Sequence, residues 1–101
     1  MTYIGSSAFA SCAGISELVL PASLKTISQS AFNSCFGLTS VTVPEAVEII
    51  SHYVFAHCTS LNTVTYGGTT EQWNEIAFGL EWRDNTPFTK IVCSDGEIPL
   101  S

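Results

Sequence analysis

A period of 23 residues is the feature of this sequence that most restricts its fold. When the sequence is shifted along itself by 23 residues, apolar residues and cysteines superpose in sets of three. A unit this short cannot bury its apolar side alone, so its copies must stack. The sequence therefore predicts a solenoid. The superposed sets are Ile4, Ile27 and Ile50; Phe9, Phe32 and Phe55; Cys12, Cys35 and Cys58; Ile15, Leu38 and Leu61; Leu18, Val41 and Val64; and Leu20, Val43 and Tyr66.

Each unit carries the same local signals. Apolar and polar residues alternate over 41–43, which predicts a short strand with one face inward, and Pro44 ends it because proline cannot donate to a strand partner. A second apolar patch around Ile50 predicts another brief strand on the opposite wall. Between the strands, Phe32 and Cys35 are spaced to share one side of a helical turn. We expect an α/β solenoid whose coils contribute strands to a parallel sheet.

The repeat fades after Tyr66, and the remaining residues predict a cap. Residues 69–79 read as one short helix, with Thr69 or Thr70 as its N-cap and Gly79 as a left-handed stop. Residues 80–88 read as irregular chain. A strand over 90–93, a turn over 94–96 and a returning strand over 97–99 predict a hairpin. We therefore expect one structural domain with three repeats over residues 1–66, the first incomplete, and a helix-plus-hairpin cap over residues 67–101.

The first repeat begins partway through the 23-residue unit, which suggests that another repeat precedes it. Ile4 already occupies a late position in its unit, so the preceding strand and turn are missing. The sequence predicts either a piece of a longer array or an open first coil. An open coil exposes the strand edge over 18–20, which invites self-association through the N-terminal end.

Charge and hydropathy exclude several classes of function. Three basic residues stand against nine acidic ones, for a net charge of −6. Nucleic-acid phosphates require a clustered basic footprint, so nucleic acid is not a predicted partner. No run of about 18 apolar residues occurs, which argues against membrane insertion. The first residues also lack the basic and apolar regions of a signal peptide.

The cysteines are predicted to be inert. Cys12, Cys35 and Cys58 share one repeat position, so their side chains should point in parallel into successive coils. Parallel Cα–Cβ directions oppose a disulfide, and buried free cysteine packs as a small apolar residue. We therefore expect a stacked column of free thiols.

No constellation for catalysis or metal binding is evident. His52 and His57 occupy positions that hold other residue types one unit earlier, so they are predicted to face outward. His57 and Cys58 are adjacent in a helical turn, where side chains diverge, which argues against a zinc site or a nucleophile pair. Glu71 and Glu75 read as a solvated helix face. No residue is predicted to be catalytic, and no cofactor or metal is expected.

A binding face has a predicted location. In a parallel solenoid sheet, the residues between buried ones point outward and form columns across the coils. Such a face would contact a protein or a glycan, although serine and threonine are also ordinary polar strand residues. Trp73 and Trp82 are predicted to fill the cap, with sugar stacking as the alternative. The candidate binding face comprises Glu17, Val19, Ser40, Thr42, Thr63 and Thr65.

The repeat resembles a known family. Its unit, with Ile, Ala-Phe, Cys, Leu and the Val-x-Val-Pro ending of residues 41–44, is similar to the BspA-type leucine-rich repeat of bacterial surface proteins. The ending, with Tyr66-Gly67-Gly68-Thr69, Gln72-Trp73 and residues 86–96, resembles the C-terminal cap of such arrays. The resemblance implies a right-handed solenoid, no catalysis, and adhesion or protein binding at the cell surface. A purely structural cap or spacer for a longer array is the alternative.

Overall fold

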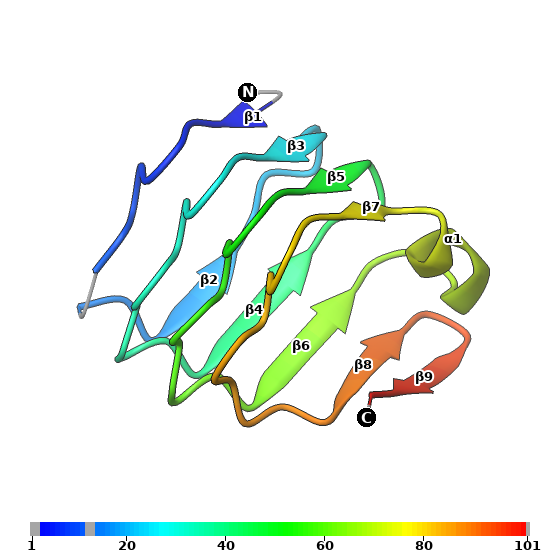
Figure 1. Cartoon of the computed structure of the whole chain (residues 1–101). Coiled ribbons are helices and arrows are strands. Elements are labelled where there is room, and N and C mark those ends of the chain that lie inside the picture. The colour runs from blue at the N-terminus through cyan, green and yellow to red at the C-terminus, as the bar shows by residue number, and fades with distance from the viewer. Residues whose placement is uncertain (1–2, 12–13, 101) are drawn as a thin grey trace.

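The chain forms a solenoid of two sheets that face each other across one core, and all their strands pair in parallel except β9 (Figure 1). The computed structural model describes residues 3–11 and 14–100. The first sheet has the order β1-β3-β5-β7, and the second has the order β2-β4-β6-β8-β9. The first consists of β1 (Tyr3–Ile4), β3 (Thr26–Ile27), β5 (Ile49–Ile50) and β7 (Ala77–Phe78); the second consists of β2 (Glu17–Val19), β4 (Ser40–Val43), β6 (Thr63–Tyr66), β8 (Lys90–Cys93) and β9 (Gly96–Pro99). The one described helix, α1, spans Thr70–Asn74.

Strand register follows the sequence repeat, which confirms the predicted fold class. Ile27 pairs with Ile4 on one side and with Ile50 on the other. In the second sheet, Val41 lies between Leu18 and Val64 in the same way. Equivalent residues therefore stack directly on one another, and each coil buries its apolar side against its neighbours.

The phenylalanines form a continuous stack through the core. The rings of Phe9 and Phe32 have centroids 5.3 Å apart with an interplanar angle of 4°, and those of Phe32 and Phe55 are 5.7 Å apart at 9°. Phe32 and Phe55 are fully buried, whereas Phe9 is 38% exposed because it ends the column. The predicted phenylalanine column is therefore present.

The cysteine column has the predicted form where it is described. Cys35 and Cys58 are buried free thiols, and Cys12 lies outside the described residues. The Sγ of Cys58 donates to the carbonyl oxygen of Phe32 at 3.1 Å, and that of Cys35 donates to Phe9 at the same distance. Each thiol thus satisfies a carbonyl of the preceding coil.

Burial raises the pKa of the Cys58 thiol from 9.0 to about 11. Between these values the folded chain keeps a proton that the unfolded chain releases, so stability must fall as pH rises. Burial also raises the pKa of Cys93 and of Tyr66, which acts in the same direction. We expect the free energy of unfolding, measured with urea, to fall by about 1–2 kcal/mol from Cys58 alone across this interval. The free energy of unfolding of Cys58→Ala should fall less steeply with pH than that of the wild type. Identical slopes for the two proteins would show that Cys58 does not cause the fall.

The region after Tyr66 departs from the prediction because it completes a fourth coil. The predicted helix over 69–79 is wrong in its second half, since α1 ends at Asn74 and β7 pairs in parallel with β5. Gly79 is not a left-handed stop; its N–H donates to the carbonyl of Ile50 at 2.8 Å. Residues 80–85 are not irregular either, because their backbone repeats the hydrogen bonds of the earlier coils, whereas residues 86–88 form no regular secondary structure. The division into repeats and cap at residue 66 remains a prediction.

An aromatic cluster closes the C-terminal end of the core. Trp73 on α1 is buried against Tyr66, with ring centroids 5.2 Å apart, and it also contacts Phe78 and Trp82. Thr69 caps the helix by accepting from the backbone N–H of Gln72, whose side chain accepts from the N–H of Thr69 in return. The predicted hairpin is confirmed, because β9 pairs antiparallel with β8.

Candidate functional site

The six predicted face residues lie on three neighbouring strands of the second sheet. Because side chains alternate along each strand, the residues between them point inward, and Val41 and Val64 are buried. Glu17 pairs with Ser40 and Ser40 with Thr63, which gives one column. Val19 pairs with Thr42 and Thr42 with Thr65, which gives the second. We call this surface, formed by Glu17, Val19, Ser40, Thr42, Thr63 and Thr65, the sheet face.

The sheet face is accessible and almost uncharged. Val19 is 72% exposed, Glu17 and Thr63 are also exposed, and Ser40, Thr42 and Thr65 are half-buried. Glu17 is the sole ionisable residue among the six. The centre of the face therefore offers hydroxyl groups and methyl groups on short side chains that lose little entropy on contact.

The hydroxyl groups at the centre have hydrogen-bonding capacity to spare. Within the described chain, the hydroxyls of Ser40, Thr42 and Thr65 form no hydrogen bond with another protein group. By contrast, Thr63 donates to the side chain of Asn62 at 3.0 Å, and Thr39 beside the face donates to the carbonyl of Ser16 at 2.8 Å. These three hydroxyls are therefore free to bond with water or with a partner.

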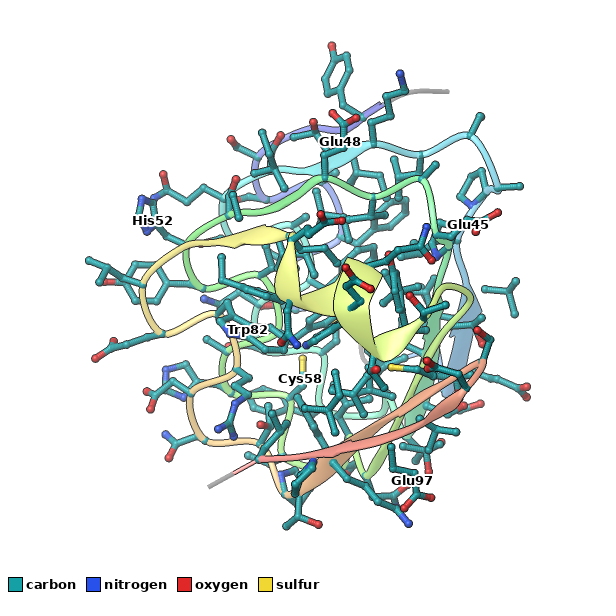
Figure 2. All side chains as sticks on the ribbon, turned by 90° about the vertical axis from the view of Figure 1, so that its right-hand side faces the viewer. Glu45, Glu48, His52, Cys58, Trp82 and Glu97 are labelled. Carbon is teal, nitrogen blue, oxygen red and sulfur yellow. The ribbon has the colours of Figure 1, made fainter. Side chains whose placement is uncertain are left out.

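The sheet continues the second column past the predicted residues. Thr65 pairs with Val92 on β8, and Val92 pairs with Glu97 on β9. The alternation of residues 90–93 indicates that Val92 faces outward, but the sequence predicts this hairpin only as part of a cap. Lys90 and Glu97 form an exposed ion pair at 3.1 Å on this border, and Figure 2 shows Glu97 at the outer edge of the molecule. A pair this exposed contributes little to stability.

The histidines and cysteines do not converge on a site. His52 and His57 are exposed, as predicted, and each bonds to the last coil. The Nδ1 of His52 accepts from the backbone N–H of Leu80 at 2.7 Å, and that of His57 lies 3.0 Å from the side-chain nitrogen of Asn85. Cys58 lies in the core, away from the imidazole of His52 (Figure 2). Over residues 3–11 and 14–100, no three His, Cys, Asp or Glu side chains are grouped as metal ligands.

Both tryptophans pack in the aromatic cluster at the C-terminal end of the core. Trp73 is buried, and Trp82 is half-buried between Phe55, Phe78 and Phe88. Neither lies on a strand of the sheet face. The face therefore offers no tryptophan platform for a sugar ring.

Two shallow hollows lie elsewhere on the surface. One, of about 300 Å³, lies between α1 and residues 45–48 and presents Glu45, Glu48 and Glu75 with Lys25 at its border. The other, of about 420 Å³, is lined by residues 81–86 of the last coil. Figure 2 shows Glu45 and Glu48 on the side of the molecule that carries α1. Neither hollow contains a nucleophile with an adjacent base.

Among the described residues, no helix is both long enough and apolar enough to cross a membrane.

Comparisons with known proteins agree with this geometry. Residues 1–91 match the family model described as the BspA type leucine rich repeat region (6 copies). The crystal structure of a leucine-rich repeat protein of T. pallidum is similar, with 26% identity and a TM-score of 0.64 over 83% of this chain. A leucine-rich repeat protein from Bacteroides ovatus ATCC 8483 shares the fold, with 20% identity and a TM-score of 0.71 over 93% of this chain. No curated protein matches the sequence.

The chain is short beside these two relatives. It spans 39% of the length of the T. pallidum chain and 25% of the length of the Bacteroides ovatus chain. What either relative does as a whole protein therefore does not transfer to this chain by similarity alone.

Proposed function

Because the chain belongs to the BspA-type leucine-rich repeat family, we propose that it is a non-catalytic module that binds another protein through its sheet face. Membership of this family makes the chain a repeat module for protein interaction or for a structural role. The proposal adds the surface, the class of partner and a location at the cell surface, where the module would serve adhesion.

The observation that carries the proposal is the set of unpaired hydroxyls at the centre of the face. Thr42 on β4 pairs with Thr65 on β6, and Ser40 lies two residues before Thr42 on the same face of β4. The hydroxyls of all three make no hydrogen bond within the described chain. A row of such groups can accept and donate across a flat interface, while the methyl groups of threonine and valine exclude water.

A protein partner is favoured over a glycan. Glycan sites commonly place an aromatic ring under the sugar, and the six residues of the sheet face include none. The face is also flat and continuous over three coils, which suits a partner with an extended surface of its own. The charged border residues Glu17 and Lys90 would mainly raise the rate of association and would contribute little to the affinity.

The sheet face can be tested with a phage-displayed library of random peptides selected on the wild-type protein. We expect the selected peptides to bind Thr42→Arg and Thr65→Arg at least about tenfold more weakly, because a long charged side chain at the centre prevents close contact. Gln29→Arg adds the same side chain at an exposed position on another wall and should leave affinity unchanged. Circular dichroism of each variant confirms that the fold is retained.

The alternatives give different results in the same experiment. If no selected peptide depends on Thr42 or Thr65, the chain is a structural spacer in a longer array and the binding proposal is wrong. If glycans on an array bind in a way that requires Thr42 or Thr65 whereas peptides do not, the partner is a glycan. The sheet face would then still be the binding site, but the proposed protein partner would be wrong.

A further inference from the structure

The sheet face continues onto a fourth strand, β8, which lies beside β6 (Figure 1). β8 has the same alternation as β6, with Lys90 exposed, Ile91 buried and Val92 half-buried. Val92 pairs with Thr65, and Lys90 directly precedes Ile91, which pairs with Val64. Lys90 and Val92 therefore extend the two columns of the sheet face, and we call the enlarged surface the four-strand face. Its first column is Glu17, Ser40, Thr63 and Lys90, and its second column is Val19, Thr42, Thr65 and Val92.

The order of residues in both columns is self-complementary. The first column begins with an anion, Glu17, ends with a cation, Lys90, and has two uncharged hydroxyl residues between them. The second column begins and ends with valine and has two threonines between them. A twofold axis that runs along the strands, between β4 and β6, would exchange β2 with β8 and β4 with β6. Such an axis brings opposite charges together in the first column and like side chains together in the second.

We propose that two copies of this chain associate face to face through the four-strand face. Glu17 of each copy contacts Lys90 of the other, and Val19 of each copy packs on Val92 of the other. The contact is isologous, because the same surface serves on both copies, and it therefore closes at two copies. This inference rests on the proposed function, since it uses the same face, and it names the partner as a second copy of the chain.

The centre of the four-strand face has the chemistry of a contact between two sheets. Its side chains are short, so two such faces can approach to the spacing of stacked sheets, about 10 Å. The twofold axis keeps the strands of both copies in the same direction, as in the aligned packing of sheets at about 30°. The hydroxyls of Ser40, Thr42 and Thr65 have no hydrogen-bond partner in the described chain, so they can bond across the contact. Val19 is 72% exposed and would be buried.

The distribution of charge favours this wall for contact between two acidic molecules. The net charge is −6, so two copies repel each other on approach. The four-strand face holds one acidic and one basic residue, whereas the hollow beside α1 presents three carboxylates and one lysine. Lys90 forms an ion pair with Glu97 of its own chain at 3.1 Å, but both side chains are 55% exposed. A second carboxylate can therefore still reach the ammonium group of Lys90.

The other way of stacking two copies of this face lacks the match. A twofold axis across the strands would place Glu17 opposite Val19 and Lys90 opposite Val92. Both charges would then lose water without gaining a partner, which is unfavourable. The contact along the strands is itself small, because stable interfaces bury about 800 Å² on each protein. We therefore expect a weak dimer, with a dissociation constant of about 0.1–1 mM.

Charge reversal at the two ends of the first column tests this geometry. Glu17→Lys places two cations opposite each other at both ends of the contact, and Lys90→Glu places two anions there. Each variant alone should therefore dimerise at least about tenfold more weakly than the wild type. In an equimolar mixture the two variants restore opposite charges at both ends, so mixed dimers should form about as strongly as wild-type dimers. Glu71→Lys makes the same charge change on α1, away from the face, and is the matched control.

Sedimentation velocity of the full chain from about 10 μM to 1 mM, in about 50 mM salt to limit screening, provides the readout. Circular dichroism confirms that each variant is folded. Glu17→Lys and Glu71→Lys both make the net charge less negative, so general repulsion alone predicts that each strengthens association. A weaker dimer for Glu17→Lys, with a dimer at least as strong as that of the wild type for Glu71→Lys, supports the face-to-face contact.

Three results would overturn the proposal. They are a wild type that is monomeric throughout, a Lys90→Glu variant that dimerises like the wild type, and a mixture of the two reversed variants that stays monomeric. Self-association through the N-terminal end would give the second result, because Lys90 lies on β8.

The peptide selection on the sheet face separates this proposal from the proposed function. If selected peptides require Thr42 or Thr65 while the wild type is monomeric, the partner is a different protein and only the self-association is wrong. If the wild type is monomeric and no selected peptide requires these residues, the proposed function is wrong as well.

Discussion

Replacing Phe32 with alanine is expected to lower the free energy of unfolding by about 3–5 kcal/mol. Phe32 is fully buried and stacks on Phe9 on one face and on Phe55 on the other. Its removal therefore leaves a cavity between two neighbouring coils, and the backbone bonds that hold these coils in register limit how far the cavity can collapse. Because coils are stabilised only by their neighbours, the loss falls on both interfaces.

Urea denaturation followed by circular dichroism measures this effect, and Phe9→Ala is the matched control. Phe9 has the same residue type and repeat position, but it contacts one ring rather than two and is already partly exposed. We expect Phe9→Ala to lower the free energy of unfolding by less than half as much as Phe32→Ala does. Equal losses for the two variants would contradict the role of the continuous stack.

Replacing Gly79 with alanine is expected to cost about 3 kcal/mol, because it forces apart the third and fourth coils. A Cβ atom on Gly79 would lie 2.3 Å from the backbone nitrogen of His52 and 2.6 Å from the carbonyl carbon of Ser51. These are backbone atoms, so they cannot rotate away as a side chain could. The hydrogen bond from Gly79 to Ile50, which joins β7 to β5, must lengthen or break.

Gly5→Ala is the control for this second variant. Gly5 occupies the same repeat position in the first coil, and a Cβ atom there would meet nothing within 4 Å. We expect Gly5→Ala to change stability by less than about 0.5 kcal/mol. Hydrogen exchange should show in addition that Gly79→Ala opens β7 and the following residues while β4 remains protected. An unchanged stability would show that the close approach is relieved at little cost. A uniform loss of protection would show that the fourth coil does not open separately from the others.

The sequence predicted the core and the sheet face because both follow from the period. Once Phe32 stacks on Phe55, the residues of β4 and β6 are in register, and alternation decides that Val41 points inward and Thr42 outward. The period of 23 residues and the alternation along each strand are therefore enough to predict which residues form the sheet face. Cys35 and Cys58 were placed by the same argument, whereas Cys12 lies outside the described residues.

The fourth coil could not be read in this way. The spacing between paired residues is 23 in the earlier coils, but Ile50 pairs with Phe78 and Val64 with Ile91. The insertion that contains α1 therefore hides the repeat from a search at a fixed period. Ala77 and Phe78 also form too short a strand to carry a periodic signal, and the helix-like pattern around Trp73 extends into them.

By itself, the sequence determined that this chain stacks coils, which residues fill the core and which line the sheet face. These follow from like residues at equal spacing, since each apolar group can be buried only against its copy. The tertiary structure alone decided that β7 joins β5 and that Gly79 has no room for a side chain. Backbone groups of distant residues determine these features, and the peptide backbone of residues 80–85 has the same chemistry whatever the side chains.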